Sequence, residues 1–107
     1  MKLHYNISGV GEPVVFIHGA FVNAQIWKHQ EAYFSEFYQV ITVDLRGHGK
    51  SDTSDLSEYH VSTFGEDILH LLDELGVEKA IICGLSLGAR VAQYLGANYP
   101  NRVSGLL

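Results

Sequence analysis

The chain alternates short apolar runs with amphipathic segments, an arrangement typical of strands joined by helices. Residues 14–17 (VVFI), 38–43 (YQVITV) and 80–83 (AIIC) are short and rich in β-branched side chains. Such runs predict strands that are covered on both faces. Residues 3–8 alternate apolar and polar side chains, which predicts a half-exposed edge strand. Residues 103–107 (VSGLL) begin like one more strand.

Three helices are predicted between these strands. Residues 24–37 place a largely aromatic set on one face: Ile26, Trp27, Gln30, Tyr33, Phe34 and Phe37. In residues 64–75 one face is apolar (Phe64, Ile68, Leu71, Leu72, Leu75) and the other is polar (Glu66, Asp67, His70, Asp73, Glu74). The sequence TFGE at 63–66 fits a capping box, Gly76 is placed to end this helix, and residues 87–97 form the third helix before Pro100.

Alternating strands and helices predict the fold class. Parallel strands need crossover connections, and the helices must cover both faces of the sheet. The chain therefore predicts an α/β fold with an open, mostly parallel sheet. Its length of 107 residues fits one domain, and no repeat or interdomain linker interrupts it.

The composition of the chain limits the kinds of molecule that it is expected to bind. Apolar residues make up 47% of the chain and charged residues 18%, and the net charge is −5 without any basic block. We therefore expect no nucleic acid and no anionic membrane as a partner. Cys83 is the only cysteine, so neither an intrachain disulfide nor a Cys-rich zinc site can form. Without a signal peptide or a membrane-spanning apolar run, the predicted location is the cytoplasm.

Glycine-rich loops follow three of the predicted strands, at residues 18–23, 44–50 and 84–88. In open α/β sheets, ligands bind beyond the carboxyl ends of the strands. We expect these three loops to meet at one edge of the sheet and to form the site there.

Ser86 stands in the most informative of these loops, between Gly84 and Gly88. A sharp turn from a strand into a helix crowds the positions two residues on either side, so small residues are needed there. The turn would expose the serine hydroxyl beside the free N–H groups of a helix N-terminus, which stabilise a nearby oxyanion. This is the pattern of a nucleophile elbow, G-x-S-x-G. The alternative is a tight turn without chemistry.

Three motifs together resemble the α/β-hydrolase fold family: VVFIHGAF at 14–21, VDLRGHGKSD at 43–52 and GLSLG at 84–88. Their order, their spacing and the strand before each motif match the family over nearly the whole chain. The resemblance is closest to small serine esterases, enol-lactone hydrolases and carbon–carbon bond hydrolases. It implies an ester, lactone or similar small carbonyl compound as substrate, and no cofactor or metal ion.

The resemblance also implies roles for single residues. Ser86 matches the nucleophile, and Gly84 and Gly88 match the elbow glycines. The backbone N–H groups of Leu87 and Ala20 match the oxyanion hole. Phe21 is a candidate for lining the substrate site, and Asp44, Arg46, Gly47 and Gly49 match a loop that is usually structural. A serine at position 86 differs from the aspartate of haloalkane dehalogenases and epoxide hydrolases.

A serine nucleophile needs a base and an acid that orients this base, and in this family both follow the serine. Residues 87–107 contain no Asp, Glu or His. We therefore interpret residues 1–107 as the N-terminal part of one α/β-hydrolase domain, inactive alone. His18 is the nearest substitute by topology, but the resemblance gives it a role in supporting the oxyanion loop.

Three alternatives stay open. The chain could be a non-catalytic ligand receptor or interaction module on the same fold. It could also complete its sheet by self-association, because residues 103–107 would form an unfinished edge. His70 and Glu74 have a spacing that could hold a metal ion, although we interpret them as a solvated helix face.

Overall fold

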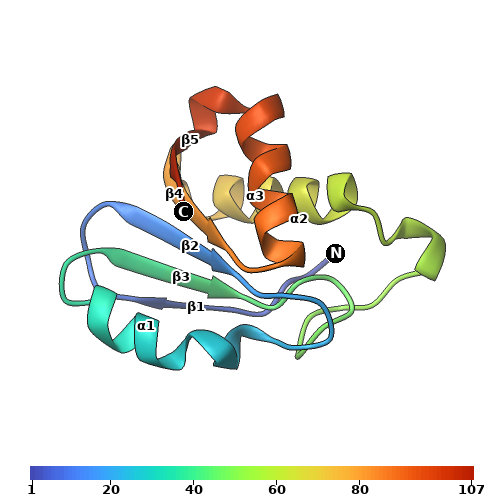
Figure 1. Cartoon of the computed structure of the whole chain (residues 1–107), viewed down its shortest axis with the longest axis horizontal. Coiled ribbons are helices and arrows are strands. Elements are labelled where there is room, and N and C mark those ends of the chain that lie inside the picture. Colours follow the sequence, from blue (N-terminus) through green and yellow to red (C-terminus); the bar gives the residue numbers. More distant parts are fainter.

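A computed structural model describes all residues, 1–107, and contains a five-stranded sheet in the order β1-β3-β2-β4-β5 (Figure 1). The strands are β1 (Tyr5–Ser8), β2 (Pro13–Ile17), β3 (Gln39–Val43), β4 (Ala80–Gly84) and β5 (Val103–Leu106). β1 runs antiparallel to β3, and all other pairs are parallel. The predicted open, mostly parallel α/β sheet is confirmed, with strand boundaries shifted by one or two residues.

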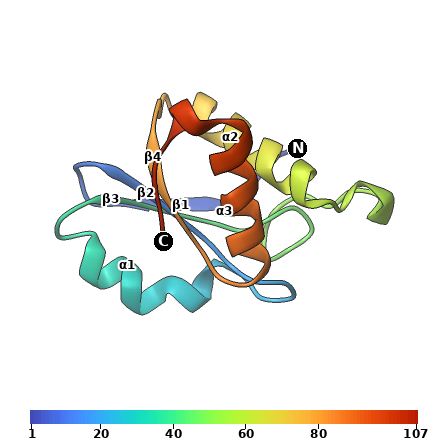
Figure 2. The same cartoon turned by 45° about the horizontal axis from the view of Figure 1, so that its top comes forward.

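Helices cover both faces of the sheet, as predicted. They are α1 (Lys28–Phe34), α2 (Val61–Glu74) and α3 (Leu87–Asn98), with short 3₁₀ turns η1 (Ala24–Trp27), η2 (Leu56–Glu58) and η3 (Pro100–Arg102). Figure 2 shows α1 alone on one side of the sheet and α2 with α3 on the other. Because β2, β3, β4 and β5 are parallel, their carboxyl ends lie at the same end of the sheet, and so do the loops that follow them.

The two faces are packed very unequally. On the side of α2 and α3, 17 buried residues form one hydrophobic cluster. On the side of α1 the buried cluster has four members, Val14, Phe16, Trp27 and Val40. The rings of Phe16 and Trp27 are in contact in a tilted arrangement, with their centroids 4.9 Å apart. The larger cluster holds the elements that carry Ser86, because α3 packs against both α2 and β4.

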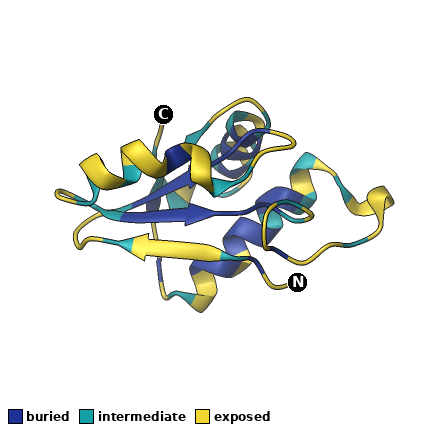
Figure 3. Ribbon diagram, turned by 90° about the horizontal axis from the view of Figure 1, so that it is seen from below, coloured by how far each residue is buried: buried dark blue, intermediate teal, exposed yellow.

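The edge strand β1 is more exposed than its alternating sequence predicted. Tyr5, Asn6 and Ile7 are all exposed, and Figure 3 shows this strand open to solvent along its length. β1 forms one edge of the sheet, and at its end Ser8 is half-buried and donates a hydrogen bond from its hydroxyl to Glu31 of α1 (3.2 Å). At the opposite edge, Leu106 of β5 is also exposed.

Two helix predictions were wrong in detail. The segment 24–37 is a 3₁₀ turn followed by a short helix, and the side chain of Asn23 caps the turn by accepting a hydrogen bond from the Gln25 N–H (2.8 Å). The predicted capping box is absent, because α2 begins two residues before Thr63 and its N-cap residue, His60, makes no side-chain cap bond. Gly76 does follow the end of α2 with a left-handed backbone (φ 70°), as predicted.

None of the helices combines the length and the apolar character that crossing a membrane requires.

Candidate functional site at the edge of the sheet

Ser86 lies at the corner between β4 and α3, where it is the N-cap residue of the helix. Its backbone has φ 56° and ψ −111°, a conformation that is strained for any residue other than glycine. The serine is exposed, and its side chain does not cap the helix. Strain and exposure together leave the hydroxyl available for contact with a ligand.

The flanking glycines are required by close backbone contacts. A Cβ atom at Gly84 would overlap the carbonyl group of Gly88. A Cβ atom at Gly88 would overlap the carbonyl oxygen of Ile17, at the end of β2. The corner can therefore form only with glycine at both positions. Gly88 also lets the start of α3 contact the end of β2, the strand that precedes the loop of residues 18–23.

The loop after β2 lies beside this corner. A Cβ atom at Gly19 would be 3.5 Å from the Cβ atom of Ser86. The Leu85 N–H donates a hydrogen bond to the carbonyl oxygen of Ile17 (3.1 Å), which joins the two segments. The structure thus brings together the two loops that the sequence placed at one site.

Several backbone N–H groups in these two loops have no acceptor in the protein, those of Leu87 and Ala20 among them. Gly88 and Ala89 donate to the carbonyl oxygens of Leu85 and Ser86, whereas Leu87 and Ala20 donate to none. Leu87 is the first residue of α3, where the helix itself provides no acceptor. Free N–H groups at a helix N-terminus favour an anion or a partly negative oxygen.

His18 is completely buried, and both of its ring nitrogens are occupied. The Leu45 N–H donates to Nε2 (2.9 Å), so this nitrogen carries no proton, and Nδ1–H donates to the carbonyl oxygen of Gly19 (2.7 Å). Burial lowers the pKa of His18 below 6.5, and the neighbouring ring of His48, 5.0 Å away, acts in the same direction. His18 is therefore a neutral support for the loop and has no free nitrogen for Ser86.

Asp44 organises the second loop, residues 44–52, from a buried position. Its Oδ1 atom accepts a hydrogen bond from the Ala24 N–H (2.8 Å) and its Oδ2 atom accepts one from the Lys50 N–H (3.0 Å). The hydroxyl of Ser51 donates to the carbonyl oxygen of Asp44. Asp44 thus ties the start of η1 to this loop, in agreement with the structural role that the resemblance implied.

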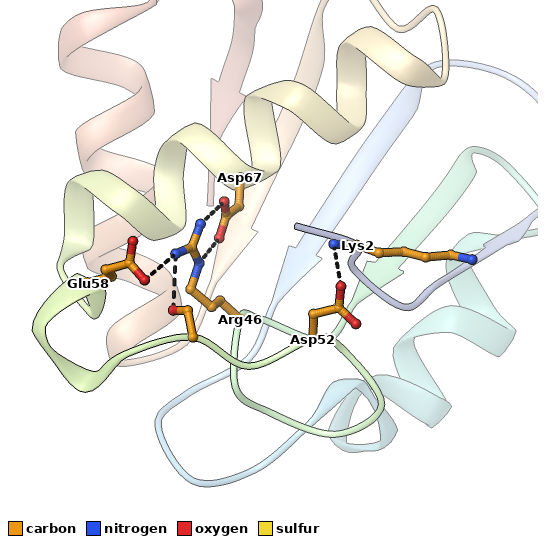
Figure 4. Close-up of polar contacts among 6 residues, drawn as sticks. Lys2, Arg46, Asp52, Glu58 and Asp67 are labelled. Carbon is orange, nitrogen blue, oxygen red and sulfur yellow. Dashed lines mark hydrogen bonds and ion pairs between the residues drawn. The ribbon is translucent and has the colours of Figure 1, made fainter.

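Arg46 connects the same loop to α2 through a bidentate ion pair (Figure 4). Its Nε and one terminal nitrogen donate to the two carboxylate oxygens of Asp67, each at 2.8 Å, and its other terminal nitrogen donates to Ser54 (3.1 Å). The hydrogen bonds to Asp67, together with the negative charges of Asp67 and Glu58, raise the pKa of Arg46. Glu58 lies 3.9 Å from the guanidinium group and is half exposed.

Asp67 is buried, although the sequence pattern predicted it on the polar, solvent-facing side of α2. Only 6% of the residue is exposed. Its position three residues after Phe64 and four before Leu71 puts it on the buried face of the helix. That spacing could have identified Asp67 as a buried ion-pair partner.

Phe21 lies next to the free N–H of Ala20 and has unusual properties. It has a left-handed backbone (φ 65°), and 98% of the residue is exposed. It borders a hollow of about 470 Å³ that the second loop and η2 close on the other side, with Val22, His48, Leu56 and Tyr59 among its lining residues.

Other candidate residues take no part in this site. Burial raises the pKa of the Cys83 thiol, so this cysteine is a poor source of thiolate. His70 is exposed on α2, and the structure contains no group of three or more His, Cys, Asp or Glu side chains placed to hold a metal ion. Of the six histidines, none is hydrogen-bonded to the Ser86 hydroxyl.

Comparison with known proteins agrees with this geometry. The sequence profile described as alpha/beta hydrolase fold matches residues 12–107. The 3-oxoadipate enol-lactonase 2 of Acinetobacter baylyi is 35% identical over 94 residues, which cover 88% of this chain and 35% of the relative. Epoxide hydrolase 3 of Siraitia grosvenorii is 34% identical over 109 residues, covering 100% of this chain and 34% of the relative.

A solved structure of a similar protein has the same fold over this part of its chain. Est816, described as an N-acyl homoserine lactone degrading enzyme, superposes with a TM-score of 0.93 at 36% identity. The alignment covers 98% of this chain and 40% of Est816. The chain thus spans about a third of the length of the curated relatives it matches. With most of its residues matched by the family profile and by these relatives, the chain belongs to the alpha/beta hydrolase fold family.

Proposed function

We propose that this chain supplies the nucleophile and the oxyanion hole of a serine hydrolase that cleaves an ester, a lactone or a related carbonyl compound. The observation that carries the proposal is the corner at Ser86. An exposed serine on a strained backbone lies where two loops meet, and the N–H groups of Leu87 and Ala20 in these loops have no protein acceptor. Such features are found together where a serine attacks a carbonyl group.

The proposed chemistry is acyl transfer. The Ser86 oxygen attacks the carbonyl carbon while a base takes the hydroxyl proton, and the carbonyl oxygen becomes an oxyanion. The N–H groups of Leu87 and Ala20 donate hydrogen bonds to this oxygen. The leaving group departs with a proton, and water then releases the acyl group from Ser86. One oxyanion donor contributes about 3–4 kcal/mol to lowering the barrier.

The base in this proposal lies outside residues 1–107. His18, the histidine nearest by topology, has both nitrogens engaged in buried hydrogen bonds, and no other histidine contacts the Ser86 hydroxyl. Because loss of a triad member costs several orders of magnitude in rate, the chain alone should be almost inactive.

The relatives alone do not determine the substrate class, since they include both a lactonase and an epoxide hydrolase. The residue at position 86 favours the first. A serine forms an acyl intermediate with a carbonyl substrate, whereas the epoxide hydrolases of this family carry an aspartate at the corner. A carbonyl compound is therefore the proposed substrate.

Acylation in the presence of imidazole tests this proposal. Imidazole replaces the missing base, and p-nitrophenyl butyrate provides the acyl group. The readout is peptide mass spectrometry, because imidazole itself cleaves the ester in solution. We expect a butyryl group on the Ser86 peptide, little of it without imidazole, and none on this peptide in Ser86→Ala.

Ser62→Ala is the matched control, because Ser62 is also exposed in the first turn of a helix but lacks the strained corner. It should leave labelling of Ser86 unchanged. A folded chain that gains no label at Ser86 would contradict the proposal and favour a non-catalytic receptor. Ser86-dependent turnover without imidazole would show that the base lies within this chain.

A further inference from the structure

Helix α3 carries part of the candidate site, because Ser86 and Leu87 lie at its start. At this end the helix is held by the close contact of Gly88 with the carbonyl group of Ile17. The free N–H groups at the start of a helix point along its axis. Apolar packing of α3 against the core has no directional preference, so a polar contact farther along the helix is needed to define the direction of this axis.

Such a contact lies near the other end of α3, at Glu66 of α2. Its Oε2 atom accepts hydrogen bonds from the hydroxyl groups of Tyr94 (2.8 Å) and Tyr99 (2.5 Å). Tyr94 follows Ser86 by eight residues, which is about 12 Å along a helix, and Tyr99 is the C-cap residue of α3. One carboxylate of α2 therefore binds the distal part of α3 at two points, through hydrogen bonds that its charge strengthens.

The surroundings hold these three side chains in one geometry. A Cβ atom at Gly65 would overlap the ring of Tyr94, so this glycine lets the ring lie directly on α2. The rings of Tyr94 and Tyr99 meet edge to face with their centroids 6.4 Å apart, and both pack against the larger hydrophobic cluster. Hydrogen bonds from Tyr99 and Tyr94 lower the pKa of Glu66, and the bond to Glu66 raises the pKa of Tyr99 to about 12. The carboxylate and the phenols therefore keep these forms at neutral pH.

Helix α2 is itself fixed to the site by the next residue, Asp67. Its carboxylate forms the bidentate pair with Arg46 of the loop 44–52. His18 connects this loop to the loop after β2, which contains Ala20. Neighbouring carboxylates of α2 thus connect the helix that carries Leu87 to the loops on the other side of the site.

We infer that Glu66 is a positioning residue of the candidate site. By binding Tyr94 and Tyr99, it sets the direction of α3 and thereby the position of the Leu87 N–H relative to the Ala20 N–H. The inference rests on the proposed function, since these two groups are the donors of the proposed oxyanion hole, but the position of Leu87 can also be followed without any reaction.

The test is the initial rate at which p-nitrophenyl butyrate with imidazole labels Ser86 in the folded chain. Glu66→Ala should lower this rate about tenfold, because a small displacement of one donor weakens the stabilisation of the oxyanion. Glu66→Gln keeps an acceptor oxygen and should stay within about threefold of the wild-type rate. Tyr94→Phe combined with Tyr99→Phe keeps both rings and should reproduce the loss, so the test does not depend on the folding of Glu66→Ala. A contact that only stabilises the fold would lower the unfolding midpoint and leave the labelling rate of the folded chain unchanged.

Glu31→Ala is the matched control, because Glu31 is a half-buried helix residue that accepts a hydrogen bond from Ser8 on the other face of the sheet. It should change neither the labelling rate nor the backbone amide signal of Leu87, whereas Glu66→Ala should shift this signal. A wild-type labelling rate in folded Glu66→Ala, or an unmoved Leu87 signal, would overturn the inference and leave the proposed function intact. Absence of Ser86 labelling in every chain, with a Leu87 signal that depends on Glu66, would defeat only the proposed catalysis.

Discussion

Two glycine-rich loops meet at the same edge of the sheet, but they differ in how their polar groups are used. In the loop of residues 44–52, the carboxylate of Asp44 accepts two backbone hydrogen bonds, and Arg46 forms a bidentate pair with Asp67. At the corner of residues 84–88, the hydroxyl of Ser86 is exposed and the N–H of Leu87 is unpaired. Both loops are rich in glycine, but the side chains of Asp44 and Arg46 in the first loop have partners in the protein, whereas the side chain of Ser86 in the second has none.

The difference distinguishes residues that stabilise the conformation of the site from residues that are free to contact a ligand. A buried polar group with all its partners stabilises one conformation, and changing it costs stability. A strained residue beside unpaired N–H groups does not stabilise the unliganded protein. We infer that such strain is retained because the residue contacts a ligand. The predictions below test this distinction in both loops.

The largest effect is expected from His18, which joins the loop after β2 to the loop of residues 44–52 through buried hydrogen bonds. His18→Ala would leave the Leu45 N–H and the Gly19 carbonyl group without partners. We expect a loss of about 2–5 kcal/mol in the free energy of unfolding, measured with urea. His18→Gln, which keeps an acceptor and a donor, should lose less.

The same residue should make stability depend on pH. Burial lowers the pKa of His18 below its unfolded value of 6.5, so below pH 6.5 the unfolded state binds more protons than the folded state. The contribution of His18 is therefore fully present above pH 6.5 and is lost as the pH falls toward the folded pKa. His29→Ala, at an exposed position on α1, should keep this slope. An unchanged slope in the His18 variants would contradict the assignment.

A smaller effect of opposite sign is expected at Ser86. Glycine adopts the backbone conformation of this corner without strain, so Ser86→Gly should raise the free energy of unfolding by about 1–3 kcal/mol relative to Ser86→Ala. Both variants remove the hydroxyl, and the comparison therefore measures the strain less the roughly 0.4–1 kcal/mol that glycine costs through the greater freedom of the unfolded chain. Thermal unfolding of the two variants gives the difference. Equal or lower stability of Ser86→Gly would contradict a strained corner of this size.

The sequence predicted the sheet and the helix α2 well because short apolar runs before glycine-rich loops are typical of buried strands, and residues 64–75 have a clear helical period. It failed at Thr63, where a capping pattern inside the first turn of α2 resembled a helix start. It also failed for residues 24–37, since aromatic spacing cannot show that a helix is short and starts as a 3₁₀ turn. Tyr33 and Phe37, predicted for the packed face, are each 60% exposed.

At the site, the sequence located Ser86 and its glycines because sterics at a sharp turn leave few choices of residue. It could not give the bonding of His18, which depends on the Leu45 N–H from a different strand's loop. Nor could it give the hollow beside Phe21, since three separate segments of the chain form its walls. These features depend on tertiary contacts rather than on local pattern.

The most direct measurement of the central claim uses butylboronic acid, whose tetrahedral adduct with a serine oxygen resembles the oxyanion intermediate. The account predicts saturable downfield shifts of the Ala20 and Leu87 amide protons in ¹H–¹⁵N spectra, absent in Ser86→Ala. An adduct that leaves both amide protons unmoved, or saturable shifts that persist without the Ser86 hydroxyl, would contradict it.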